Sequence, residues 1–284
     1  MKMKQIDKQI NDIATDKNKG AIELAGQALE VVRSAVTFSR ATDTDSFLAE
    51  IKDVINKLAI CRPAMAVISN KVLRFDKWLQ DFPIKNIDLE VLRSECLKTV
   101  DKLKEELIEN KKKSIEHAAG IIDKTSVIVI CSYSSTINAV LAKAVKQGKK
   151  LVLHIIKSSS GGISYGEISK KALESYGVEC ELFDDDMIAA ALIGADMVVL
   201  GSDTVFTDGS VLNGYPSLLL ATLAQETVPV YVVSDTSKIN LDNKKYGSEQ
   251  GFELIPFEFL TGLITEHGIF KGDDIIAYLK SLDD

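Results

Sequence analysis

The spacing of apolar residues changes once along this chain, near Lys124, and that change constrains the fold more than any other feature. Before it, apolar side chains recur every three or four residues, which is the period of an amphipathic helix. Three such stripes are Ile22, Ala25, Leu29, Val32 and Val36; Leu48, Ile51, Ile55 and Leu58; and Leu89, Leu92, Cys96, Val100, Leu103 and Leu107. Asp88 is placed to cap the third helix. Residues 1–115 are therefore predicted to form a helical N-terminal domain.

After Lys124, short runs rich in Val and Ile alternate with helical segments. The predicted strands are 127–131, 151–156, 179–183, 197–201 and 228–233, with a sixth at 252–255, and the predicted helices are 136–147, 167–176, 186–193 and 215–225. Strand and helix in strict alternation, with strands uninterrupted by polar residues, are typical of a parallel sheet covered on both faces. Residues 116–284 are therefore predicted to form an open, doubly wound, Rossmann-like α/β domain.

Composition excludes several classes of function. The 284 residues carry 41 acidic against 34 basic side chains, a net charge of −7, which is the wrong sign for a nucleic-acid surface. No apolar run approaches the ~18 residues of a membrane span, so we expect a cytoplasmic protein without a membrane partner. The four cysteines and three histidines are widely scattered, which predicts no zinc site and no disulfide framework. We also expect no other metal and no resident cofactor.

Ligands of open α/β sheets bind at the carboxyl ends of the strands, so the loops that follow the predicted strands are the candidate site. The first loop contains Ser132, Ser134 and Ser135, whose hydroxyls and neighbouring helix amides can hold an anion such as phosphate. Ordinary capping of the helix by serine explains the same pattern equally well. The second loop contains Ser158, Ser159, Ser160, Gly161 and Gly162 and is either a second cradle for an anion or a surface loop.

Later loops carry the charged candidates. Asp203 follows the fourth strand, where a carboxylate can act as an acid or a base, and Lys238 ends the fifth loop. The run 184–186 consists of three aspartates, for which helix capping by Asp186 is favoured over metal binding. Cys131 ends the first strand and is either an acid/base thiol or an inert buried hydrophobe.

The loops, taken in order, resemble the initiation factor 2B-related family. The resemblance rests on IVICSYSSTINAVLAKAVKQGKKLVLHI and GADMVVLGSDTVFTDGSVLNGYPSLLLATLAQETVPVYVV, and it extends to GAIELAGQAL, CRPAMAVISNKV and FEFLTGLITEHGIF. That family includes regulatory subunits of translation initiation factor 2B, ribose-1,5-bisphosphate isomerase and methylthioribose-1-phosphate isomerase. The resemblance implies a helical domain followed by a Rossmann-like domain, dimers, and phosphorylated sugar or nucleoside ligands at the strand ends.

Carried over residue by residue, the resemblance gives a divided answer. The isomerases' aspartate corresponds to Asp203, but their cysteine corresponds to Ser132, and Cys131 comes one residue early. One step along a strand turns a side chain to the opposite face, which makes Cys131 a poor substitute. Among the phosphate contacts, Arg62 is retained. The family's Asn-Lys pair reads Asn213-Gly214, and the expected arginine of the second loop is missing.

The leading hypothesis is a homodimeric module that binds a small phosphorylated metabolite, a sugar phosphate or a nucleotide, with little or no catalysis, and that contacts a translation initiation factor. The alternative is an aldose-ketose isomerase in which Asp203 and either Cys131 or Ser132 form the acid/base pair. A third interpretation is a sugar-phosphate or nucleotide effector domain of another Rossmann-like family.

Overall fold

The computed structural model of this chain describes residues 3–85, 87–241 and 251–282. The chain divides into two compact units, Met1–Glu109 and Asn110–Asp284. The division lies inside one long helix, α5 (Leu89–Ile121), which belongs to both units. The domain boundary predicted after residue 115 falls in the same helix.

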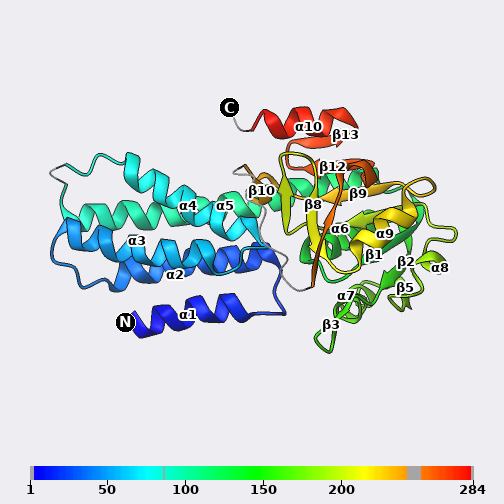
Figure 1. Cartoon of the computed structure of the whole chain (residues 1–284), viewed down its shortest axis with the longest axis horizontal. Helices are drawn as coiled ribbons and strands as arrows, with labels where there is room; N and C mark the ends of the chain where they lie inside the picture. Colours follow the sequence, from blue (N-terminus) through cyan, green and yellow to red (C-terminus); the bar gives the residue numbers. More distant parts are fainter. Residues whose placement is uncertain (1–2, 86, 242–250, 283–284) are drawn as a thin grey trace. The chain divides into compact units, whose positions relative to one another are not determined.

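The N-terminal unit consists of helices, as the apolar stripes predict. Its elements are α1 (Met3–Thr15), α2 (Ala21–Phe38), α3 (Thr44–Ile60), α4 (Ala66–Asp81) and the first part of α5. The apolar stripe of α2 is buried, and α2 and α3 both pack against α4 (Figure 1). Asp43 caps α3 by accepting from the Ser46 amide, and Asp88 accepts from the Glu90 amide at 2.8 Å at the start of α5. The predicted cap at Asp88 is therefore confirmed.

The C-terminal unit is built on a seven-stranded sheet. In sheet order its strands are β13 (Gly268–Lys271), β12 (Gly262–Thr265), β9 (Val230–Val233), β6 (Met197–Leu200), β1 (Thr125–Cys131), β2 (Lys150–Ile156) and β5 (Glu179–Phe183). Every neighbouring pair is parallel except β12 and β13, which are antiparallel. The predicted doubly wound parallel sheet is confirmed, with one antiparallel edge strand added.

Helices cover both faces of this sheet (Figure 1). They are α6 (Ser135–Lys146), α7 (Tyr165–Glu174), α8 (Ile188–Ala191), α9 (Ser217–Ala224) and α10 (Asp273–Lys280). Successive residues of a strand point to opposite faces, so β1 contributes to two cores. Ile128 and Ile130 pack with α6 and α7, whereas Val129 and Cys131 pack with α8, α9 and α10.

A second sheet departs from the prediction. Its strands, in order, are β10 (Ile239–Asn240), β7 (Thr204–Phe206), β8 (Val211–Gly214) and β11 (Phe252–Ile255). The predicted sixth strand at 252–255 forms, but it pairs antiparallel with β8 instead of joining the main sheet. The short hairpin β3 (Ser159–Ser160) and β4 (Ile163–Ser164) was not predicted either.

The predicted helix at 186–193 was too long, because α8 spans only Ile188–Ala191. The predicted capping of this helix by Asp186 was wrong, since its N-cap residue is Met187 and no side chain caps it. In the part of the chain that the structure describes, no helix combines the length and the apolar character required to cross a membrane.

Candidate functional site

The topology of the main sheet gathers the candidate loops at one edge. The chain moves from β1 to β2 and β5 on one side, and to β6, β9 and β12 on the other. The strand order therefore reverses between β1 and β6, and such a switch point is where open α/β sheets bind ligands. The loops after β1 and β6 carry Ser132 and Asp203, respectively.

Cys131 is the last residue of β1, and its side chain lies in the hydrophobic core. It packs with the aliphatic side chains of Ile156 and Val205, among others. Burial raises the pKa of the Cys131 thiol far above its ordinary value, and the negative charge of Asp185 acts in the same direction. A thiol in this environment stays protonated at neutral pH and resembles an inert buried hydrophobe.

Ser132 follows directly and turns the chain out of the strand. Its φ angle is 66°, in the left-handed region that residues other than glycine rarely adopt. Its hydroxyl points toward Gly214, where a Cβ atom would lie 3.3 Å from Ser132 Oγ. Two of the positions at which this chain departs from the isomerase pattern, Ser132 and Gly214, are thus in contact with each other.

The remaining serines of the first loop form the start of α6. Ser134 is its N-cap residue, and its Oγ accepts from the Ile137 amide at 3.3 Å. A Cβ atom at Gly201 would lie 2.7 Å from Ser134 Oγ, so glycine there leaves room for the cap. Ser135 Oγ accepts from Lys111 Nζ at 3.1 Å, which places a cation at the N-terminus of α6.

The second loop is held by a carboxylate of the protein itself. Asp185 accepts from the amides of Ser158, at 2.6 Å, and Ser159, at 2.9 Å. Ser158 has a φ angle of 52°, and its hydroxyl donates to the carbonyl oxygen of Tyr215. The Ser158 and Ser159 amides, which were candidate donors to a phosphate, are engaged by Asp185.

The rest of this loop is a tight hairpin. Ser160 pairs with Ile163 across it, and the two-residue turn is Gly161-Gly162, with φ angles of 57° and 80°. Two successive positive φ angles are typical of the turn that joins twisted hairpin strands, and they explain why glycine occupies both positions. Lys157, which directly precedes this loop, forms an ion pair with Asp184, and the hydrogen bond to Asp184 raises the pKa of Lys157.

Lys238 is buried near the ends of β6 and β9. Its side chain is 4% exposed, and its Nζ donates to the carbonyl oxygen of Ser202 at 2.6 Å. Among the described residues, no carboxylate oxygen lies within ion-pair distance of this Nζ. Asp203 comes next after Ser202, and its amide donates to the Leu212 carbonyl at 2.9 Å. A buried ammonium and a carboxylate therefore flank Ser202.

Asn213 lies on β8 opposite Glu253 of β11, and its side chain is buried. Glu253 accepts from the Leu218 amide at 3.0 Å and so supplies a hydrogen-bond acceptor for an amide in the first turn of α9. These contacts place Asn213 beside Gly214 and next to the loop that carries Ser132.

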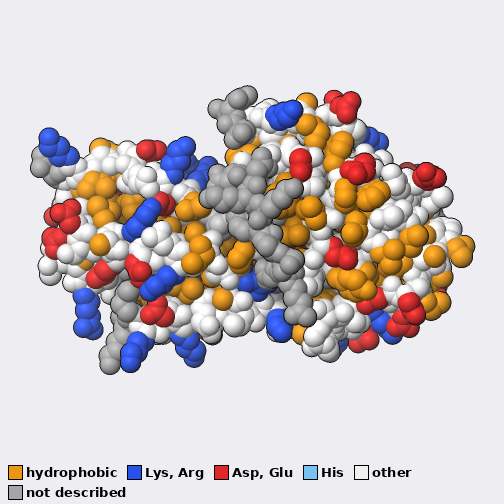
Figure 2. All heavy atoms as spheres, in the orientation of Figure 1, with side chains coloured by type: hydrophobic (Ala, Val, Ile, Leu, Met, Phe, Trp, Pro, Cys, Tyr) orange, Lys and Arg blue, Asp and Glu red, His pale blue; other side chains and the backbone are white. Residues whose placement is uncertain are grey.

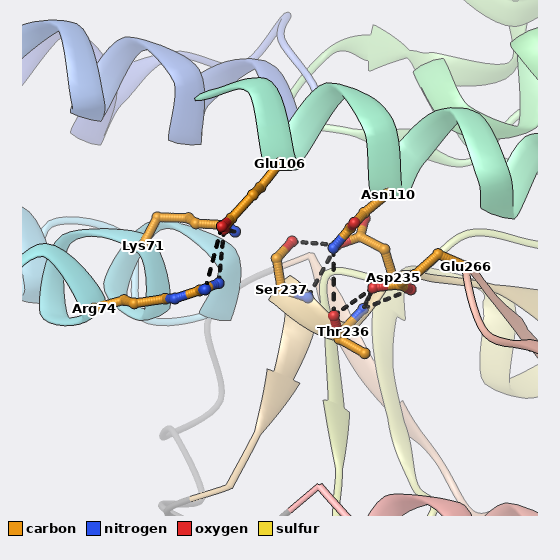
Figure 3. A network of polar contacts seen from close by, with 8 residues as sticks. All are labelled: Lys71, Arg74, Glu106, Asn110, Asp235, Thr236, Ser237 and Glu266. Atoms are coloured by element: carbon orange, nitrogen blue, oxygen red, sulfur yellow. Dashed lines mark hydrogen bonds and ion pairs between the residues drawn. The ribbon is translucent and has the colours of Figure 1, made fainter. Parts of the chain in front are cut away.

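A buried acidic network lies beyond the ends of β9 and β12 (Figure 3). Glu266 accepts from the amide of Thr236 at 3.0 and 3.1 Å and from its hydroxyl. Asp235 caps the short 3-10 helix η1 (Thr236–Lys238) by accepting from the amide and the hydroxyl of Ser237. Both carboxylates therefore fix the backbone that carries Lys238.

Arg62 belongs to the N-terminal unit, where its NH1 group donates to the carbonyl oxygen of Asp16 at 2.6 Å. In the same unit, Glu106 lies 2.8 Å from Arg74 NH1 and 3.7 Å from Lys71 Nζ (Figure 3). The other candidate residues all lie in the C-terminal unit.

The sequence reasoning missed three residues that contact the candidate loops or the segment before Lys238: Lys111, Asp185 and Glu266. Lys111 lies on a helix that was interpreted only as a packing element. Asp185 was one of three adjacent aspartates, and the sequence does not distinguish which of them faces the loop after β2. Glu266 lies in the segment FEFLTGLITEHGIF, whose resemblance to the family was noted without a role for its acid.

Comparison with known proteins identifies the family of this chain. A model described as the initiation factor 2 subunit family matches residues 17–248. This chain belongs to that family.

Two proteins that are similar to this chain have different names. A Pyrococcus furiosus protein named putative translation initiation factor eIF-2B subunit 2-like is 27% identical over 278 residues, 92% of this chain and 95% of that protein. The ribose 1,5-bisphosphate isomerase of Haloferax volcanii is 24% identical over 305 residues, 98% of this chain and 92% of that protein.

The solved structure of the Pyrococcus horikoshii OT3 translation initiation factor eIF-2B has the same fold. Its TM-score is 0.82 at 23% identity, covering 93% of this chain and 96% of that one. The family match confirms the resemblance seen in the sequence, and the similar proteins include one named a putative translation initiation factor and one named an isomerase.

Proposed function

We propose that this chain is a dimeric, initiation factor 2B-like module with little or no isomerase turnover. It binds a small phosphorylated metabolite beside the carboxyl ends of β6 and β9, a region that we call the β6–β9 end. The observation that carries the proposal is the chemistry at the end of β1. The thiol there, Cys131, lies in the core and stays protonated, and the outward position is occupied by Ser132. A serine hydroxyl is a weak acid unless a base activates it, so proton transfer at this position is disfavoured.

The charges that remain support anion binding. Lys238 is buried, and its Nζ donates to one carbonyl oxygen, that of Ser202, which leaves two of its three N–H donors for a ligand. Lys111 lies at the N-terminus of α6, where helix amides and the helix dipole also favour negative charge. A phosphorylated ligand with its phosphate toward Lys238 would form charge-assisted hydrogen bonds there.

Calorimetric titration with ribose 1,5-bisphosphate tests binding, and assay of the ketose product tests turnover. We expect binding without measurable conversion of ribose 1,5-bisphosphate or methylthioribose 1-phosphate. Turnover that Asp203→Asn abolishes would contradict the noncatalytic proposal. Absence of binding by sugar phosphates and nucleotides would contradict the metabolite site.

The second candidate function is an aldose-ketose isomerase. It is favoured by Asp203 at the end of β6 and by the relative named ribose 1,5-bisphosphate isomerase. In that case Asp203 and Ser132 would exchange protons with the substrate, because Cys131 points into the core. The same turnover assay decides between the two, with Ser132→Ala expected to lower kcat if this second function is correct.

Two partners belong to the proposal. A second copy of the chain would complete the dimer, and a translation initiation factor would be the regulated partner, as the name of the Pyrococcus furiosus relative suggests. Co-sedimentation of this chain with purified initiation factor 2, with and without ribose 1,5-bisphosphate, tests the second partner. Absence of co-sedimentation in both conditions would limit the function to metabolite binding.

A further inference from the structure

The carboxylate of Glu253 lies beside the candidate site. Glu253 is opposite Asn213 in the antiparallel pair of β11 and β8, so the two side chains lie on the same face of the small sheet. The Glu253 carboxylate accepts from the Leu218 amide at 3.0 Å, which fixes it at the start of α9. A Cβ atom on Gly214, the residue after Asn213, would lie 3.3 Å from Ser132 Oγ. The segment that Glu253 faces is therefore in contact with the loop after β1.

A second carboxylate, that of Asp185, lies at the loop after β2. It accepts from the Ser158 amide at 2.6 Å, and the Ser158 hydroxyl donates to the carbonyl oxygen of Tyr215 at the end of β8. Burial raises the pKa of the Cys131 thiol, and the negative charges of Asp185 and Glu253 raise it further. Both carboxylates are therefore close enough to act on the end of β1.

These two carboxylates are not balanced by cations. Among the described residues, neither Asp185 nor Glu253 forms an ion pair, and the neighbouring Lys157 is paired with Asp184. The whole net charge of −7 belongs to residues 110–284, which carry 23 acidic and 16 basic side chains, whereas residues 1–109 carry 18 of each. Figure 2 shows acidic side chains spread over the C-terminal unit on the face that it draws. An additional anionic group would meet a negative potential here.

We propose that Asp185 and Glu253 make the candidate site selective for a monophosphate whose other end carries hydroxyl groups, and that they weaken the binding of a bisphosphate. This inference rests on the proposed function, since it takes the single phosphate to lie at the β6–β9 end near Lys238. That end is joined to the carboxylates through β8. The Asp203 amide donates to the carbonyl oxygen of Leu212 at 2.9 Å, and Leu212 directly precedes the residue that Glu253 faces.

A carboxylate distinguishes these two kinds of ligand by hydrogen bonding and by charge. It has about four lone-pair sites, so Asp185 and Glu253 can still accept from sugar hydroxyls after binding their backbone amides. A phosphate group carries a charge of about −1.5 to −2 at neutral pH and offers mainly acceptors. Repulsion between like charges less than about 10 Å apart near a protein surface is enough to weaken binding about 10-fold.

Calorimetric titration with two ligands that differ by one phosphate tests this selectivity. We expect ribose 5-phosphate to bind at least about 10-fold more tightly than ribose 1,5-bisphosphate. A site lined by cations would give the opposite order, because the second phosphate would add charge-assisted hydrogen bonds. Equal or tighter binding of ribose 1,5-bisphosphate would therefore overturn the inference.

The variant Glu253→Gln isolates the effect of charge. Glutamine keeps an oxygen that can accept from the Leu218 amide, so the start of α9 retains its acceptor while the negative charge is removed. We expect the preference for ribose 5-phosphate to fall by at least about 3-fold. Glu258→Gln is the matched control, because Glu258 is exposed on the 3-10 helix η2 (Phe257–Phe259), and it should leave the preference unchanged. A preference that Glu253→Gln does not reduce would overturn the role of Glu253.

The same titrations separate this inference from the proposed function. If neither ribose 5-phosphate nor ribose 1,5-bisphosphate binds, the metabolite site itself is contradicted and the selectivity falls with it. If both bind and ribose 1,5-bisphosphate binds more tightly, the metabolite site stands and only the selectivity is overturned.

Discussion

Two regions at the carboxyl edge of the main sheet differ in the partners of their polar groups. One is the β1–β2 end, formed by the loops after β1 and β2, and the other is the β6–β9 end. At the β1–β2 end, the second loop's amides are bound by Asp185, Lys157 is paired with Asp184, and the thiol of Cys131 is buried. At the β6–β9 end, the buried ammonium of Lys238 donates to a single carbonyl oxygen, that of Ser202.

The difference indicates that the first end is structurally complete without a ligand, whereas the second retains charge that a ligand can use. Buried charge without a counter-ion is costly to maintain. Its persistence at the β6–β9 end therefore favours placing the phosphate there, and each prediction below tests the contrast between the two ends.

The largest expected effect is on ligand affinity at Lys238. Lys238→Met keeps the length of the side chain but removes its charge, and we expect about 10- to 100-fold weaker binding of ribose 1,5-bisphosphate, the value of a charge-assisted hydrogen bond. Lys157→Met removes an exposed, paired lysine from the other end and should change affinity less than about 2-fold. Calorimetric titration measures both, and equal losses from the two variants would remove the contrast between the ends.

The second effect is on stability at the β1–β2 end. Asp185→Ala leaves the amides of Ser158 and Ser159 without their acceptor, and we expect a loss of about 2–3 kcal/mol in the free energy of unfolding. Asp186→Ala is the control, because Asp186 is exposed and should change stability by less than about 0.5 kcal/mol. Urea unfolding measures both variants. A loss of stability at Asp186 equal to that at Asp185 would mean that the loop is not held as described.

The fold could be predicted from the sequence where many residues repeat one signal. The apolar stripe of α2 repeats over several helical turns, and β1 is an uninterrupted run rich in Val and Ile. The small sheet could not be predicted, because strands of two to four residues such as β10 and β7 are too short to show a period. Its strand β11 carries an adequate signal, but pairing with β8 depends on contacts distant in sequence.

The candidate site was predictable in location and less so in chemistry. Parallel topology alone brings the loops after β1 and β6 together, so Ser132 and Asp203 fall at the switch point as expected from their order. Which aspartate of residues 184–186 turns toward Ser158 depends on side-chain direction in an irregular loop, for which no period exists. The burial of the Lys238 side chain likewise follows from packing around η1, and its neighbours in the sequence do not indicate it.

A third prediction concerns backbone strain at Ser132. A φ angle of 66° costs a residue with a Cβ atom about 1–2 kcal/mol, and glycine avoids most of that cost. Ser132→Gly should therefore be more stable than Ser132→Ala by about 1 kcal/mol, since both lack the hydroxyl and only one relieves the strain. Thermal unfolding compares the two. Equal stabilities would mean that Ser132 does not adopt this conformation in solution.

The smallest effect is the pH dependence of stability that arises from Cys131. Burial raises the pKa of the folded Cys131 thiol far above that of the unfolded thiol, which is about 8.5. Only the unfolded chain then releases this proton as pH rises above about 8.5, so alkaline pH favours unfolding, by about 0.8 kcal/mol at pH 9. Between pH 7 and pH 9, the Cys131→Val variant should therefore lose about this much less stability than the wild-type chain. Comparing these two losses, and not the stabilities themselves, cancels the effect of the substitution on packing. Cys180→Val should give nearly the same result, because burial raises the pKa of Cys180 to about 11, which is still well above pH 9. A Cys131→Val variant with the same pH dependence as wild type would mean that the thiol at the β1 end ionises in the folded chain, which would restore it as a candidate acid for the isomerase reaction.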